Sequence, residues 1–270
     1  MNHESLIQVD WDVDEDDRKT GVVVLTLNQP DKKNALTVAM GEELKATVSR
    51  LTSESTLRSV VITGAGDAFS AGGDFAFLKA RTEASRESNT FEMKEFYDRF
   101  LSLRRLPVPT IAAMQGPAIG AGLCLGLACD MRLCAEDAKL GATFVGLGLH
   151  PGMGATHFLP QIVGPQSAAR LLLTGEVILG WEAKQLGMVI DALPRDAVLP
   201  HTLKLARKMA AQGPVAVQTC VRSLRCGQED MLNRALWREA EAQATCYATE
   251  DLKNGIDAVQ NRRKVVFSGS

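Results

Sequence analysis

The sequence predicts a mixed α/β core followed by a helical C-terminal region. In the first half of the chain, signals for strand, turn and helix repeat in that order, which is typical of α/β folds. After Gly154 helical periodicity dominates, and no long linker or low-complexity stretch separates the two halves. The third observation is a glycine-rich stretch at 110–130, where a short apolar strand leads through a turn into a helix with almost no polar atoms.

The elements follow from local patterns. Alternation at 7–13 allows an edge strand, and runs of β-branched residues predict strands at 22–27 and 58–63. Thr37 is a good N-cap for a helix that ends near Leu51. The polar residues 81–90 are expected to be mobile, and a helix over 91–106 stops before Pro107. Later segments are a strand at 110–114, a helix at 121–128, short strands at 131–133 and 139–141, a glycine-rich loop at 144–154, and helices at 165–173, 181–186, 197–212, 215–226, 229–247 and 250–263.

Composition narrows the classes of function. The chain has 270 residues, enough for one large domain with or without an appendage. Its net charge of −2, from 30 basic and 32 acidic residues, offers no basic face for nucleic acid. We find no basic leader before an apolar run and no apolar stretch of about 18 residues, so we expect neither a signal peptide nor a membrane span. The six cysteines form no CxxC pair, and the four histidines are scattered, so we expect free thiols in a reducing cytoplasm and no metal site.

The stretch at 110–130 predicts a site for negative charge. A strand that feeds a glycine-rich turn and then a helix directs free backbone N–H groups at one point. Gly120 and Gly122 carry no Cβ, so another group can approach the backbone closely. Such a place binds a phosphate or a developing oxyanion, and tight helix packing through small residues is the alternative.

Two other chemistries fit this stretch less well. Gly120, Gly122 and Gly126 nearly match the dinucleotide fingerprint, but the third glycine is one position late and no acid follows about 20 residues on. Cys124 as a nucleophile has only apolar neighbours, which favour an inert buried thiol.

Three ordered motifs resemble the crotonase (enoyl-CoA hydratase/isomerase) superfamily. They are Phe-Ser-Ala-Gly-Gly-Asp at 69–74, Ala-Ala-Met-Gln-Gly-Pro-Ala-Ile-Gly-Ala-Gly at 112–122 and Pro-Gly-Met-Gly-Ala-Thr at 151–156. Asn-Gln-Pro at 28–30 and Asn-Ala-Leu at 34–36 are similar to the family's opening strand and acyl-CoA loop. The resemblance implies a ClpP-like spiral of ββα units over 1–195, a helical trimerisation region over 196–270, and a homotrimer or hexamer.

The resemblance also implies a substrate and a site. The family polarises the thioester carbonyl of an acyl-CoA with two backbone N–H groups, which by motif position are those of Gly73 and Ala121. Coenzyme A enters as part of the substrate, with no permanently bound cofactor. The implied contacts to the acyl-CoA are Lys32, Lys33, Ala35, Ala71, Asp74 and Phe75, and the implied acyl pocket contains Leu123, Cys124 and Phe144.

The proton-handling residues depart from the family. Hydratases resembling this chain use two glutamates, and Cys124 and Phe144 occupy those positions here. Tyr97 and His150 are the remaining candidates for proton transfer near the pocket, each with a structural role as the alternative. We therefore expect an atypical acyl-CoA enzyme. The alternatives are a decarboxylase or hydrolase acting on an acyl-CoA or acyl-carrier-protein thioester, and a non-catalytic acyl-CoA binding protein.

Overall fold

The computed structural model describes residues 5–270, so the first four residues of the predicted core, His3 among them, lie outside the described part. The strands are β1 (Ile7–Val13), β2 (Lys19–Leu27), β3 (Ser59–Gly64), β4 (Thr110–Met114), β5 (Ala118–Ile119), β6 (Met131–Ala135), β7 (Lys139–Gly141), β8 (Val177–Leu179) and β9 (Asp191–Leu193). The helices are α1 (Val38–Thr52), α2 (Phe75–Arg81), α3 (Arg86–Leu101), α4 (Ala121–Leu127), α5 (Ala155–Thr174), α6 (Gly180–Gln185), α7 (Arg195–Ala210), α8 (Pro214–Arg225), α9 (Gln228–Tyr247) and α10 (Glu250–Gln260).

A six-stranded sheet in the order β1-β2-β3-β4-β6-β9 forms the centre of the molecule. Among the described strands of this sheet, β1 is antiparallel to β2 and the other neighbouring pairs are parallel. A second sheet has the order β5-β7-β8, in which β5 is parallel and β8 antiparallel to β7. Strands β3 and β4 are buried at every position, as parallel strands covered on both faces require. The predicted α/β core with a helical C-terminal region is confirmed.

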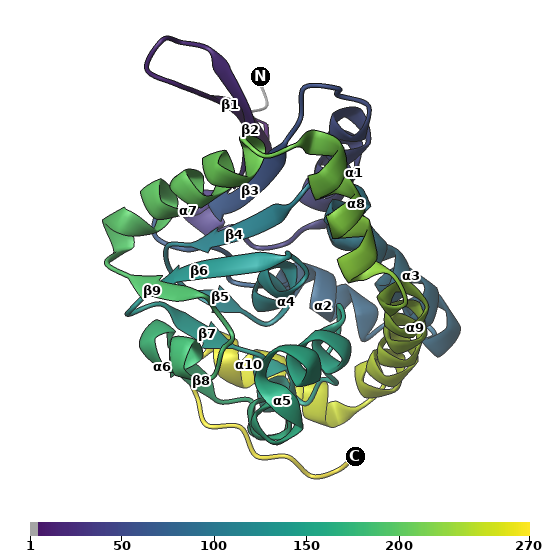
Figure 1. Cartoon of the computed structure of the whole chain (residues 1–270). Coiled ribbons are helices and arrows are strands. Elements are labelled where there is room, and N and C mark those ends of the chain that lie inside the picture. Colours follow the sequence, from purple (N-terminus) through teal and green to yellow (C-terminus); the bar gives the residue numbers. More distant parts are fainter. Residues whose placement is uncertain (1–4) are drawn as a thin grey trace.

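The helices divide into groups on different sides of the sheet (Figure 1). Helix α7 packs against β2, β3, β4 and β6, whereas α3 and α9 pack against each other on the other side of the molecule. Helix α1 begins as predicted, since the Thr37 hydroxyl accepts a hydrogen bond from Met40 N at 3.2 Å. Within residues 5–270, no helix combines the length and the apolar composition needed to cross a bilayer.

Several predicted boundaries are wrong. Residues 81–90, predicted to be mobile, contain the last residue of α2 and the first turn of α3, because Ser85 caps α3 by accepting from Ser88 N at 3.2 Å. The sequence analysis missed α2, β5, β8 and β9, which are each seven residues or shorter and leave little periodicity to detect. Helix α5 consists of two helical parts separated by Gly164, whose φ of +77° is not helical; the second part begins at Pro165, as predicted, and the first begins ten residues earlier, at Ala155.

Candidate active site

The loop before α2 leaves one backbone amide free. Leu36 N donates to Gly72 O at 2.7 Å, and Asp74 N donates to Leu36 O at 3.3 Å. Because alternate residues of an extended segment point in opposite directions, the N–H of Gly73 faces away from Leu36. Within residues 5–270 that N–H donates to no acceptor.

The turn before α4 leaves a second amide free. Gly120 adopts φ +54°, a conformation that favours glycine, and its N–H donates to Gly141 O at 2.8 Å. Ala121 is the first residue of α4, so its N–H has no partner within the helix. Among the described residues it has none outside the helix either.

Glycine packing brings these two turns together. A Cβ built on Gly72 would lie 2.5 Å from Ile119 O and 3.5 Å from Ala121 N, so only glycine fits there. A Cβ on Gly122 would lie 2.6 Å from Ser70 O, which shows that close backbone approach and tight helix packing are both realised in this stretch. Gly73 and Ala121 line the same cavity.

This main cavity has a volume of about 420 Å³. It is walled by the two turns, by α2, α3, α9 and α10, and by the segment 143–153. Its lining residues are Ala71, Gly72, Gly73, Phe75, Phe77, Leu78, Met93, Phe96, Tyr97, Ile119, Gly120, Ala121, Thr143, Phe144, Gly146, Leu147, Leu149, Gly152, Met153, Gln243, Tyr247 and Val259. Of these described residues, none carries a carboxylate, an amine, a guanidinium, an imidazole or a thiol.

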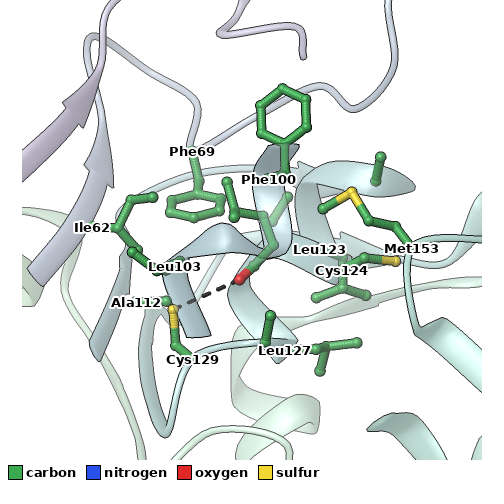
Figure 2. Packing of buried hydrophobic residues seen from close by; sticks show 14 of the residues in the cluster. Ile62, Phe69, Phe100, Leu103, Ala112, Leu123, Cys124, Leu127, Cys129 and Met153 are labelled. Atoms are coloured by element: carbon green, nitrogen blue, oxygen red, sulfur yellow. Dashed lines mark hydrogen bonds between the residues drawn. The ribbon is translucent and has the colours of Figure 1, made fainter. Parts of the chain in front are cut away.

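Two of the three predicted pocket residues are placed elsewhere. Phe144 lines the main cavity, as predicted, but Leu123 and Cys124 do not. Both belong to the buried core, where Figure 2 shows them beside Met153 and Leu127. Cys124 is fully buried with its thiol 3.3 Å from Gly152 O, and burial raises the pKa of that thiol well above its ordinary value. The prediction failed because α4 is apolar on all sides, so its sequence does not mark the face that meets the cavity.

Tyr97 lines the main cavity, whereas His150 does not. Tyr97 donates its hydroxyl hydrogen bond to Gln243 Oε1 at 2.8 Å, and burial raises the pKa of the hydroxyl well above its ordinary value. The hydroxyl is therefore neutral and able to donate. His150 Nδ1 lies 2.6 Å from Pro151 O, and its neighbours Leu149 and Gly152 line the cavity in its place. The predicted presentation of His150 to the cavity is not found.

The predicted acyl-CoA loop lies at the edge of the main cavity. Lys32 and Lys33 are exposed, and Lys33 O accepts from Ala71 N at 2.8 Å, which joins the lysine pair to the cavity wall. The buried Asn34 side chain accepts a hydrogen bond from Gln29 N and donates hydrogen bonds to Ala65 O and Ala68 O. These bonds hold the loop in place.

The other three predicted contacts surround this loop. Ala71 and Phe75 line the main cavity, and Ala35 lies half-buried beside Asn34. Asp74 caps α2 by accepting from Ala76 N at 3.0 Å, so its carboxylate has a structural partner.

The sequence analysis missed two polar residues of α9. Glu239 is fully buried, and its carboxylate accepts from Gly154 N at 2.7 Å and from Thr156 N at 2.8 Å, which caps α5. Gln243 connects Tyr97 to His150 O, to which its Nε2 donates at 2.8 Å. The buried face of α9 carries Glu239, Gln243 and Tyr247 at intervals of four residues. Polar residues within an otherwise apolar helix face indicate buried hydrogen-bonding groups, and this pattern could have identified them from the sequence.

Comparison with known proteins identifies the family. Residues 17–270 match the model of the enoyl-CoA hydratase/isomerase family. The chain belongs to the enoyl-CoA hydratase/isomerase family. The resemblance to the crotonase superfamily seen in the sequence is thereby confirmed.

Characterised and solved family members cover nearly the full length. The chain is 35% identical over 253 residues to a crotonyl-CoA hydratase of Syntrophomonas wolfei, covering 93% of this chain and 96% of that protein. It is 34% identical over 252 residues to a 2,3-dehydroadipyl-CoA hydratase of Escherichia coli, covering 93% and 97%. The structure of OdaA from Pseudomonas aeruginosa superposes with a TM-score of 0.83 at 31% identity, covering 96% of this chain and all of that one.

Proposed function

We propose that this family member binds an acyl-CoA thioester in the main cavity and stabilises its enolate with the backbone N–H groups of Gly73 and Ala121. The observation that carries the proposal is the pair of unpartnered amides on one apolar cavity. Donors fixed by the backbone need no reorganisation as charge develops on the oxygen, so they stabilise the transition state more than the substrate.

We assign binding of the carrier, coenzyme A, to the exposed loop that holds Lys32 and Lys33. Two exposed ammonium groups suit the phosphates of coenzyme A, and the hydrogen bond from Ala71 N to Lys33 O connects their loop to the wall of the main cavity. An acyl-carrier protein presents a phosphopantetheine without the nucleotide phosphates. Preference for the carrier-protein thioester over the CoA thioester would contradict this assignment.

The reaction differs from carboxylate-assisted hydration. The described lining supplies no carboxylate to activate water or to remove a proton from the α carbon, so both hydration and double-bond isomerisation lack their base. We assign Tyr97 as the donor that supplies a proton to the α carbon, because its hydroxyl lines the main cavity. In this step the O–H must turn from Gln243 Oε1 to the carbon, and water must reprotonate the phenolate that is left.

A second candidate is non-catalytic binding of acyl-CoA. The absence of a basic group among the described lining residues favours it, since a binder needs only the two amides and an apolar wall. The two candidates differ in one outcome: the binder forms the complex and turns over none of the thioesters.

The experiment compares two ligands by titration calorimetry. Hexanoyl-CoA has the thioester carbonyl, and S-hexyl-CoA has the same chain without it. We expect hexanoyl-CoA to bind about tenfold more tightly, because one or two modest hydrogen bonds to the carbonyl add a corresponding amount of binding free energy. Absence of binding by either ligand would contradict the acyl-CoA proposal, and equal affinities would contradict the amide pair.

A proline variant tests the amide itself. Ala121→Pro removes the N–H at the first helical position, which is where proline is tolerated. The preference for hexanoyl-CoA over S-hexyl-CoA should disappear in this variant. The matched control is Arg86→Pro, at the exposed first position of α3, which should keep the preference.

A further inference from the structure

The wall of the main cavity is rich in aromatic side chains. Both of the chain's tyrosines and four of its nine phenylalanines line it. They are Phe75, Phe77, Phe96, Tyr97, Phe144 and Tyr247. Phe77 and Phe96 stack with their ring centroids 5.0 Å apart. Aromatic walls of this kind favour flat or flexible apolar groups over polar ones.

The side chains of Tyr97, Gln243 and Tyr247 in this wall have hydrogen-bond partners, whereas the Thr143 hydroxyl has none among the described residues. Tyr97 donates to Gln243 Oε1 at 2.8 Å, and Gln243 Nε2 donates to His150 O at 2.8 Å. The Tyr247 hydroxyl lies 3.3 Å from Met93 Sδ, which accepts its hydrogen bond. A ligand group that needs a hydrogen-bond donor beside Tyr97, Gln243 or Tyr247 would have to break one of these pairs.

A cation lies beside the wall and does not line it. The guanidinium carbon of Arg81 is 5.4 Å from the centroid of the Phe77 ring, which lines the main cavity, whereas Arg81 is not among the lining residues. Arg81 Nη1 is 3.9 Å from a Glu92 carboxylate oxygen. A carboxylate that entered the main cavity would therefore lose its water without gaining a charged partner.

We infer that the acyl group accepted here is uncharged and apolar, of six or more carbons or carrying an aromatic ring, and that acyl groups ending in a carboxylate are rejected. The inference rests on the proposed binding of an acyl-CoA thioester. Its physical basis is that transfer of an unpaired carboxylate into apolar surroundings is costly, whereas each buried methylene is favourable.

Hexanoyl-CoA and adipyl-CoA test the inference, because both have six-carbon acyl chains and only the terminal group differs. Titration calorimetry should show hexanoyl-CoA binding at least about 100-fold more tightly than adipyl-CoA. From butyryl-CoA to octanoyl-CoA the affinity should rise about fourfold per methylene. An adipyl-CoA affinity within about threefold of that of hexanoyl-CoA would overturn the inference.

The failure of the proposed function gives a different pattern. If hexanoyl-CoA and adipyl-CoA both bound only as tightly as free CoA, the proposal of an apolar acyl site would be overturned. Recognition of coenzyme A would still stand. Absence of binding by every CoA derivative, S-hexyl-CoA included, would overturn both proposals.

A variant of this ring provides a second readout. Phe77→Ala removes the ring that lines the main cavity beside Arg81, and adipyl-CoA should then gain at least about tenfold in affinity while hexanoyl-CoA loses affinity. The matched control is Phe91→Ala, a largely exposed phenylalanine of α3 outside the cavity wall, which should change neither affinity. Unchanged adipyl-CoA binding by Phe77→Ala, with the protein still folded, would overturn the role of the ring.

Discussion

Tyr97 and Gln243, 146 positions apart in the chain, are joined by a hydrogen bond of 2.8 Å in the wall of the main cavity. The bond links α3 to α9. The Gln243 amide is itself held by His150 O, so its Oε1 faces the tyrosine and fixes the direction of the hydroxyl. The Tyr97 hydroxyl is thus neutral and oriented, and it lies close to Gly152.

Replacement of this hydroxyl is the first prediction. Tyr97→Phe should lower the rate of the reaction that the enzyme catalyses by at least about 100-fold, because the proton donor is lost. Affinity for hexanoyl-CoA should stay within about threefold, since the ring remains. Assays of hydration, decarboxylation and hydrolysis with the two proteins measure this. His150→Ala is the control and should retain the rate, because that side chain does not line the cavity; a larger loss in His150→Ala than in Tyr97→Phe would reverse the assignment.

Hydration of crotonyl-CoA should be slow. Phe144 stands in the cavity at one position of the missing glutamates, and Cys124 is turned into the core at the other. Each general acid or base contributes about 10²–10⁴-fold, so the rate should be at least about 100-fold below that of the crotonyl-CoA hydratase of Syntrophomonas wolfei assayed in parallel. Comparable turnover by the two proteins would contradict this prediction.

Loss of the Glu239 carboxylate should destabilise the fold. Glu239→Ala leaves the buried Gly154 N and the partly buried Thr156 N as donors without a partner, which should cost about 3 kcal/mol of unfolding free energy. Glu239→Gln keeps an acceptor oxygen and should cost less. Urea denaturation of the two variants measures the difference, and equal losses would show that the hydrogen bonds are not the cause.

The pair formed by Asp130 and Arg225 should govern acid stability. Arg225 Nε and Nη2 donate to the two Asp130 carboxylate oxygens at 2.9 and 2.6 Å. Burial alone would raise the pKa of Asp130, but hydrogen bonds from Arg225 and Thr110 outweigh it and hold the pKa below its ordinary value of 3.8. A lowered folded-state pKa contributes stability above pH 3.8 that is lost as the pH falls through the folded value.

Two variants separate this contribution from general acid unfolding. Arg225→Ala leaves a largely buried carboxylate unpaired and should cost about 3–5 kcal/mol at pH 7. Asp130→Asn should remove the stability change that accompanies titration of this group below pH 3.8. Denaturant midpoints measured between pH 3 and pH 7 test both, and an unaltered acid profile in Asp130→Asn would contradict the assignment.

The oligomeric state is the last prediction. We expect a homotrimer or a hexamer, formed through the helical region 196–270. Exposed large apolar residues are frequent there, which favours burial between subunits. They are Val215, Leu224, Met231, Trp237, Val259, Val266 and Phe267. Light scattering after gel filtration should give three or six times the mass of one chain, and a concentration-independent monomer would contradict it.

The sequence by itself determined the fold class and the family. Strand β3 and the strand, turn and helix of β4 to α4 were predictable because their patterns are local. The glycine-rich turn before α4 predicts free N–H groups for the same reason, because a turn at a helix start fixes their direction with little dependence on distant side chains. The assignment of the two amides to Gly73 and Ala121 came from the resemblance to the family's motifs.

Only the tertiary structure decided which side chains meet the substrate space. Helix α4 is buried at every position, so its sequence gave no sign that Cys124 faces Gly152 and the core. The extended backbone before Pro151 likewise did not reveal that His150 lies off the cavity wall. Tyr97 receives its partner from α9, far along the chain, and contacts of that kind depend on how helices pack. The chemistry of this site is therefore set by packing between distant elements, while its capacity to hold an oxyanion is set by local backbone geometry.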